Sequence, residues 1–189
     1  MNMPFLKNIT LCGVKHAGKT TAANALAKLT GLPFADSDDA LQVLYYHETG
    51  SDLSVREIFR TLGEEGFRRL EMRALRNLFS GDGKKIVALG GGVLTNPFFT
   101  EDDREKLGFL CCVDVPDKVA YQRIMKNGLP PFLREKTDPF GAFCEMNQTR
   151  RAVFRSQADF ILEITNGSEA IPEQTAERIL SAYKELNHE

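Results

Sequence analysis

The segment from Gly13 to Thr20, with the sequence GVKHAGKT, constrains the fold of this chain more than any other feature. It matches the pattern G-x-x-x-x-G-K-[ST] without departure, and it lies between a β-prone run at 8–12 and an alanine-rich helical run that ends near Leu29. Backbone N–H groups of such a loop surround phosphates at the positive end of a helix, while Lys19 reaches the β- and γ-phosphates and the Thr20 hydroxyl can ligate Mg²⁺. The alternative is a glycine turn that happens to hold a lysine, and the flanking strand and helix argue against it. We therefore expect the chain to bind ATP with Mg²⁺.

Short apolar runs alternate with helical runs along the rest of the chain. The runs that read as strands span residues 8–12, 32–35, 86–89, 109–115 and 160–164. Helices are expected at 18–29, from 38, from 54, at 64–78, from 100, and at 116–126, 138–157 and 172–186. Because parallel strands need crossovers, this alternation predicts an α/β fold with helices on both faces of a parallel sheet. With 189 residues the chain is expected to form one domain, residues 1–189, whose ligands gather at the carboxyl ends of the strands.

Composition argues against several classes of function. The 24 Lys and Arg residues nearly balance the 26 Asp and Glu residues, so we expect no polyanionic partner such as nucleic acid. No run approaches the roughly 18 apolar residues of a membrane span, and no signal-peptide pattern is present, so we expect a soluble, cytoplasmic protein with no membrane partner. The four cysteines lack C-x-x-C spacing and the three histidines form no H-E-x-x-H pair. These patterns predict reduced thiols and a metal ion that arrives with the nucleotide.

Two carboxylates flank Ser37 directly after the second predicted strand. Asp36 and Asp38 could lie across the sheet from the phosphate loop, one acting on Mg²⁺ through water and the other accepting hydrogen bonds from an acceptor hydroxyl. The alternative is a helix cap, since aspartate satisfies free N–H groups at that position. The triplet alone leaves both interpretations open.

Candidate anion-binding groups occur in three further places. Arg68 and Glu71 are spaced i and i+3, so on a helix the acid could orient the guanidinium to grip a carboxylate in bidentate fashion. A solvated charged face is the alternative for this pair, as it is for Arg150 and Arg151. Gly90–Gly92 ends the third predicted strand, and three glycines in a row allow a closer approach of backbone to a ligand than a plain turn requires.

The order of these motifs resembles that of the shikimate kinases over essentially the whole chain. That family carries the phosphate loop, an Asp-Ser-Asp triplet, a Gly-Glu-x-x-Phe-Arg helix, a Gly-Gly-Gly turn, a lid and a late Arg-x-x-x-Tyr-like segment. The matching segments here are Gly13 to Thr20, Asp36 to Asp38, Gly63 to Arg68, Gly90 to Gly92, residues 127–138, and Arg151-Ala152-Val153-Phe154. The resemblance implies a three-layer P-loop NTPase fold with a five-stranded parallel sheet in the order 2-3-1-4-5.

The resemblance also implies an acceptor site for shikimate. Asp38 would hydrogen-bond the acceptor hydroxyls and help to remove the proton of the attacking one. Arg68, Arg151 and the Gly91 backbone would bind the shikimate carboxylate, and Glu71 would support Arg68.

A nucleotide site is implied in the same way. Lys19 would stabilise charge on the transferring phosphoryl group, while Thr20 and Asp36 would serve the magnesium ion. The nucleotide contacts would come from His16, Ala17, Gly18, Lys19, Thr20, Thr21 and, against the adenine, Arg123.

The lid departs from the family pattern. Family members usually have Arg-Pro-Leu-Leu there, with the arginine over the phosphates, whereas this chain has Pro130 at that position. An arginine on the transferring group can be worth about 10³ or more in rate, so its loss would be costly unless Arg134 or Lys126 substitutes. Phe154 and Val153, where tyrosine and proline are usual, are milder changes.

The leading hypothesis is therefore transfer of the ATP γ-phosphoryl group to the 3-hydroxyl of shikimate, in aromatic amino-acid biosynthesis, by a monomeric enzyme. A kinase for another small polyol acid such as gluconate is a second hypothesis. A nucleotide-binding regulatory module without catalysis is a third, favoured only by Pro130. The matched acceptor set of Arg68, Arg151, Gly91 and Asp38 favours shikimate.

Overall fold

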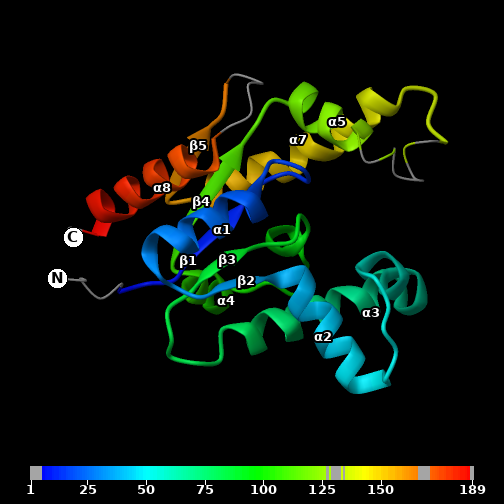
Figure 1. Cartoon of the computed structure of the whole chain (residues 1–189). Coiled ribbons are helices and arrows are strands. Elements are labelled where there is room, and N and C mark those ends of the chain that lie inside the picture. The colour runs from blue at the N-terminus through cyan, green and yellow to red at the C-terminus, as the bar shows by residue number, and fades with distance from the viewer. Residues whose placement is uncertain (1–5, 127, 129–132, 134, 166–170, 188–189) are drawn as a thin grey trace.

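The structure is a computed structural model that describes residues 6–126, 128, 133, 135–165 and 171–187. Its strands form one sheet (Figure 1). They are β1 Ile9–Cys12, β2 Phe34–Asp36, β3 Ile86–Ala88, β4 Phe109–Asp114 and β5 Phe160–Glu163. The order is β2-β3-β1-β4-β5 and every neighbouring pair is parallel, which confirms the predicted topology.

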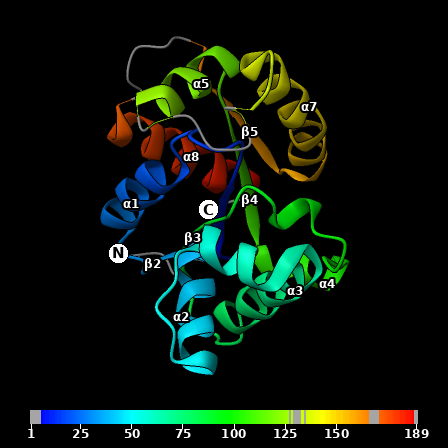
Figure 2. The same cartoon turned by 90° about the vertical axis from the view of Figure 1, so that its right-hand side faces the viewer.

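Helices cover both faces of this sheet. They are α1 Lys19–Thr30, α2 Ser37–Thr49, α3 Val55–Leu78, the 3₁₀ turn η1 Val93–Thr95, α4 Glu101–Leu107, α5 Asp117–Lys126, α7 Pro139–Gln157 and α8 Pro172–Asn187. Figure 2 shows α1 and α8 on one side of the sheet and α3, α4 and α7 on the other. The arrangement is the expected three-layer α/β fold, since each crossover helix packs back onto the parallel sheet.

The helix ends follow capping signals in the sequence. Gly31 ends α1 at φ 74°, a left-handed conformation that glycine adopts without a Cβ clash. Capping boxes begin α3, through Ser54 and Glu57, and α4, through Thr100 and Asp103. These caps fix where each helix starts and hence which side chains reach the strand ends.

The position of β1 in the middle of the sheet brings the loops of the neighbouring strands together. Leu11 of β1 is in register with Ala88 of β3 on one side and Cys111 of β4 on the other. Because all the strands point the same way, their carboxyl ends meet at one edge. The segments that follow β1, β2, β3 and β4 therefore share that edge.

Buried apolar side chains form two clusters. The main cluster surrounds the sheet and contains β1, β3 and β4, whose residues read as nearly continuous apolar runs because both faces are covered. A second cluster, which we call the α2–α3 cluster, lies between those two helices. Its buried members are Leu41, Tyr45, Ile58, Phe67, Leu70 and Ala74. The helices that follow β2 thus carry a small core of their own.

The cysteines agree with the expectation of reduced thiols. Cys12, Cys111 and Cys112 are buried in β1 and β4, Cys144 is half-buried, and all four are free. Among the described residues, no helix has the length and apolar character needed to cross a membrane.

Candidate active site

The loop after β1 has the backbone geometry that its glycines allow. Gly13 has φ 146°, and a Cβ there would collide with the carbonyl oxygen of Val113 on β4, so only glycine fits. Gly18, at φ 97°, is the N-cap of α1 and offers no side chain to the first turn. The N–H groups at this positive helix end are therefore available to an anion, which is the arrangement that phosphate binding requires.

Lys19 lies inside this loop. Its Nζ donates hydrogen bonds to the carbonyl oxygens of Gly13, at 3.0 Å, and Val14, at 3.1 Å. Burial lowers the pKa of Lys19 from its ordinary value, although the nearby carboxylates of Asp38 and Asp36 act in the opposite direction. The structure thus holds a cationic group at the loop that a phosphate could draw toward itself.

Asp36 caps a helix and also contacts the phosphate loop. Its Oδ1 accepts the backbone N–H of Asp38 at 2.9 Å, so Asp36 is the N-cap of α2. Its Oδ2 accepts a hydrogen bond from the Thr20 hydroxyl at 3.1 Å. A hydroxyl and a carboxylate meet here beside the phosphate loop, and hard oxygen donors of this kind suit Mg²⁺.

Asp38 points to the same edge of the sheet from the first turn of α2. Burial, together with the negative charges of Asp36 and Glu71, raises the pKa of Asp38 from 3.8 to about 6, against the opposing charges of Lys19 and Lys15. The carboxylate is therefore ionised at neutral pH but close to its titration range. A group poised in this way can take up a proton from a bound hydroxyl.

The three glycines after β3 lie among these charged groups. A Cβ on Gly90 would collide with the Asp38 carboxylate, and one on Gly92 would collide with the Arg68 guanidinium. A Cβ on Gly91 would lie 4.0 Å from the Lys15 backbone nitrogen in the phosphate loop. Glycine at positions 90 and 92 thus lets the segment pass beside the carboxylate and the guanidinium, while Gly91 lies next to the phosphate loop. The run is more than a plain turn.

Arg68 is held in place by buried neighbours. Its Nη1 donates to Glu71 Oε2 at 3.0 Å, as the i and i+3 spacing predicts. Asn96 Nδ2 donates both to that same oxygen, at 2.8 Å, and to the Arg68 carbonyl, at 2.9 Å. Glu71 and Asn96 are buried, so the charged-surface interpretation of this pair is wrong. Asn96 had no signal in the sequence, because its role depends on η1 folding back onto α3.

The two adjacent arginines of α7 face different neighbours. Burial and the charge of Arg68 lower the pKa of Arg150, which Glu71 partly opposes, so the Arg150 charge interacts with those of Arg68 and Glu71. The Arg151 guanidinium instead contacts Asp114 and Asp117, at 2.8 and 2.9 Å. Successive residues of a helix point about 100° apart, so one arginine cannot follow the other to the same site. The structure thus holds the predicted Arg151 against Asp114 and Asp117, while Arg150 is the arginine of this pair whose charge interacts with that of Arg68.

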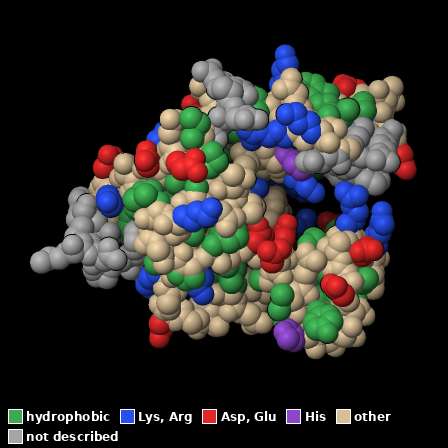
Figure 3. All heavy atoms as spheres, viewed as in Figure 1, with side chains coloured by type: hydrophobic (Ala, Val, Ile, Leu, Met, Phe, Trp, Pro, Cys, Tyr) green, Lys and Arg blue, Asp and Glu red, His purple; other side chains and the backbone are tan. Residues whose placement is uncertain are grey.

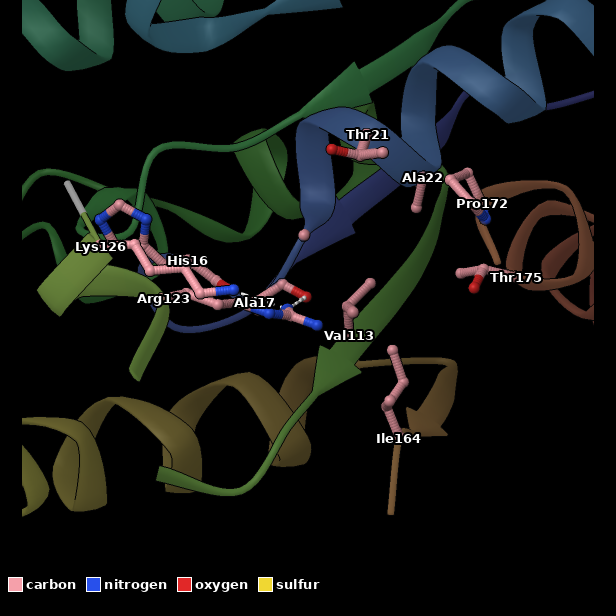
Figure 4. Close-up of a pocket in the computed structure, with 11 residues that line it drawn as sticks. His16, Ala17, Thr21, Ala22, Val113, Arg123, Lys126, Ile164, Pro172 and Thr175 are labelled. Atoms are coloured by element: carbon pink, nitrogen blue, oxygen red, sulfur yellow. Dashed lines mark hydrogen bonds between the residues drawn. The ribbon is translucent and has the colours of Figure 1, made fainter. Parts of the chain in front are cut away.

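A cavity of about 500 Å³ lies on the other side of the phosphate loop (Figure 4). Arg123 of α5 lies against the phosphate loop at this cavity, and its Nη1 donates to the carbonyl oxygens of His16 and Ala17, both at 3.1 Å. Burial and the charges of Lys15, Lys19 and Arg123 lower the pKa of His16, which keeps its imidazole neutral at pH 7. The lining residues are His16, Ala17, Gly18, Thr21, Ala22, Val113, Arg123, Lys126, Ile164, Pro172 and Thr175.

This cavity contains five residues predicted to contact the nucleotide: His16, Ala17, Gly18, Thr21 and Arg123. Thr20 instead contacts Asp36, and Lys19 donates to the Gly13 and Val14 carbonyl oxygens of the loop. Sequence reasoning missed Ala22, Val113, Ile164, Pro172 and Thr175. They are unremarkable residues in sequence, and only the order of β1, β4 and β5 brings the last four beside the loop.

The face that carries the site is hollowed between α2 and α3 on one side and α5 and α7 on the other. Figure 3 shows acidic side chains at the edge of this hollow and basic side chains across from them. The predicted lid, residues 127–138, falls partly outside the described residues, which do not include Pro130 or Arg134.

Comparisons with known proteins agree on one family. A family model described as shikimate kinase matches residues 15–184. The shikimate kinase of a Nostoc species is 33% identical over 177 residues, which cover 93% of this chain and 90% of that protein.

Solved structures give the same result. The shikimate kinase from Acinetobacter baumannii, in complex with shikimate, superposes with a TM-score of 0.79 at 28% identity and covers 97% of this chain and 96% of that one. A gluconokinase from Sinorhizobium meliloti superposes with a TM-score of 0.58 at 15% identity, covering 98% of this chain and 96% of that one, and shows the shared fold alone.

Proposed function

This chain belongs to the shikimate kinase family, and from that membership we propose that it transfers the γ-phosphoryl group of ATP to the 3-hydroxyl of shikimate. The observation that carries the proposal is the meeting of the phosphate loop, Asp38 and Arg68 around Gly90–Gly92. One anchored arginine for a carboxylate, one carboxylate for a hydroxyl and one loop for phosphates are the groups that this reaction needs.

Binding of the acceptor is assigned to two arginines. Arg68 is supported by Glu71, and Arg150 stands near both of them, so two positive charges can face a single carboxylate. The Gly91 backbone completes this group, since no side chain blocks its approach. Arg150 takes the role that the sequence assigned to Arg151.

The chemistry is assigned to Asp38 and Lys19. Asp38 accepts hydrogen bonds from the acceptor hydroxyl and takes its proton as the oxygen attacks. Its pKa of about 6 leaves it ionised at pH 7, yet basic enough to hold the proton. Lys19 stabilises the charge that develops on the transferring phosphoryl group.

Magnesium is assigned to Thr20 and Asp36. Their adjoining oxygen atoms fit a hard divalent cation, directly for the hydroxyl and through water for the carboxylate. When bound, the ion neutralises charge on the β- and γ-phosphates.

The remaining expectations form part of the same proposal. They are a single domain over residues 1–189, a lid at about 127–138, a monomer, a cytoplasmic location, and no nucleic-acid or membrane partner. Lys126 is the described residue best placed to replace the lid arginine, because it lines the nucleotide cavity.

The test is release of ADP from Mg-ATP with and without shikimate, with gluconate as the control acceptor. We expect turnover that depends on shikimate and is lost in Asp38→Asn. Turnover with gluconate alone would assign a different acceptor. Tight ATP binding without turnover on any acceptor would overturn the proposal in favour of a nucleotide-binding module.

A further inference from the structure

Arg151 makes a nearly complete set of hydrogen bonds within the protein. Its Nε donates to Asp114 at 2.8 Å, its Nη1 to Asp117 at 2.9 Å, and its Nη2 to the Val115 carbonyl at 2.9 Å and to Asp117 at 3.0 Å. These bonds use four of the five N–H donors of the guanidinium. Only one N–H donor remains for a ligand. The role of Arg151 therefore depends on the residues that it contacts.

The residues that it holds form the junction between β4 and α5. Asp114 ends β4, Asp117 begins α5, and Val115 lies between them. A second residue of α7, the buried Asn147, donates to Asp117 at 3.0 Å. Residues 147 and 151 are i and i+4 and so share a helix face. Helix α7 thus contacts the start of α5 through two side chains that are one helical turn apart.

Charge makes this contact strong. Burial alone would raise the pKa of Asp117, but the hydrogen bonds from Arg151 and Asn147 and the Arg151 charge outweigh it, so the pKa is lowered. A bidentate pair between arginine and carboxylate fixes orientation as well as distance. The start of α5 is therefore fixed in direction, and the helix carries that direction along its length.

The C-terminal end of α5 lies at the nucleotide cavity. Arg123 lies six residues beyond Asp117 and donates to two carbonyl oxygens of the phosphate loop, and Lys126 lines the same cavity. One turn further along α7, Arg155 contacts Asp114 and also donates to Glu163 at 2.9 Å. Glu163 precedes Ile164, another residue of the cavity lining.

We propose that Arg151 is a positioning residue for the nucleotide, which it serves by anchoring α5 so that Arg123 meets the phosphate loop. The proposal rests on the kinase function above, but it assigns to Arg151 the nucleotide half of the site in place of the acceptor half. Adjacent arginines on α7 then serve different substrates, Arg150 the acceptor and Arg151 the nucleotide.

The test compares Arg151→Met with Arg150→Met by initial rates under variation of each substrate. Arg151→Met is expected to raise the KM for ATP about tenfold, equivalent to about 1.4 kcal/mol, with the KM for shikimate changed less than about twofold. Arg150→Met is expected to do the reverse. Arg151→Lys, which keeps the charge but loses the bidentate fork, should recover only part of the ATP effect.

Two further measurements keep the result interpretable. Binding of ADP by calorimetry tests Arg151 independently of turnover, so failure of the shikimate assay in the wild type would not be confused with failure of this inference. Arg76→Met removes a comparable arginine–aspartate pair, to Asp103, away from both substrates, and it should lower stability without changing the KM for ATP.

If Arg151→Met fails to fold, Asp117→Asn releases the same anchor and is expected to raise the KM for ATP selectively. The inference is overturned if Arg151→Met, or Asp117→Asn in its place, raises the KM for shikimate as much as that for ATP. It is equally overturned if ADP binding is unchanged.

Discussion

At neutral pH Asp38 is ionised in an environment that disfavours its negative charge. Its pKa is raised to about 6, so the folded state binds the Asp38 proton more tightly than the unfolded chain does. The free energy of unfolding therefore falls as the pH rises from about 4 to above 6, and the penalty persists at pH 7. A residue kept under this strain is typical of a functional position.

We predict that Asp38→Asn is more stable than the wild type at pH 7, by up to about 3 kcal/mol, and equally stable near pH 4. Urea unfolding at the two pH values measures the difference. In the wild type, kcat/KM should decline as the pH falls below about 6, because the carboxylate becomes protonated. A less stable Asp38→Asn at pH 7 would contradict the assigned pKa.

At the scale of single elements, α3 has a kink on the N-terminal side of Arg68. Gly63 interrupts the helix with φ 68° and ψ -178°, a conformation essentially restricted to glycine. The first half of α3 begins at its capping box, while the second half carries Arg68 and Glu71 to the glycine segment. The bend thus separates the capped start of α3, which packs into the α2–α3 cluster through Ile58, from the part of the helix that carries Arg68.

We predict that Gly63→Ala destabilises the protein by about 1–3 kcal/mol, since alanine is strained at that φ and ψ. Gly83→Ala is the matched control, because a Cβ there meets open space at an ordinary φ. Thermal unfolding of the two variants should separate them, and the KM for shikimate should rise in Gly63→Ala alone. Equal unfolding temperatures would show that the kink stores no strain.

Local signals in the sequence predicted most of these elements, but not every contact between them. The phosphate loop, the strand runs and the caps at Ser54, Thr100 and Asp138 are short-range patterns that a few residues determine. The sequence assigned the acceptor to Arg151, whereas the structure holds that guanidinium against Asp114 and Asp117. Adjacent helix residues differ only in direction, which depends on how α7 packs. The sequence also did not predict that Pro172 lines the nucleotide cavity, since only the order of the strands in the sheet brings it there.

On the scale of the whole molecule, the two clusters of buried side chains differ greatly in size. The main cluster contains the sheet, whereas the α2–α3 cluster has six buried members. Segments with few buried apolar contacts open locally at lower free energy than the core. Asp38 and Arg68, which we propose bind the acceptor, thus lie on the helices with the smaller buried cluster.

We predict that backbone amides of α2 and the first half of α3 exchange with solvent faster than those of β1 and β4. Shikimate at 100 times its Kd should slow exchange in these helices, since a ligand at that concentration stabilises the state it binds by about 2.7 kcal/mol. Hydrogen exchange with and without shikimate measures this. Uniform protection across the chain would contradict it.

The neighbouring arginines of α7 also restrict how this chain can change in length. Asp138 caps the helix and Pro139 begins it, so the helix start is fixed about three turns before the pair. Deleting one residue between Asp138 and Arg150 would rotate the rest of the helix by about 100° and turn each guanidinium away from its partner. Insertions and deletions should therefore be tolerated in surface loops but not within this half of α7. Even one alanine added there would turn both guanidinium groups away from the side chains that they face.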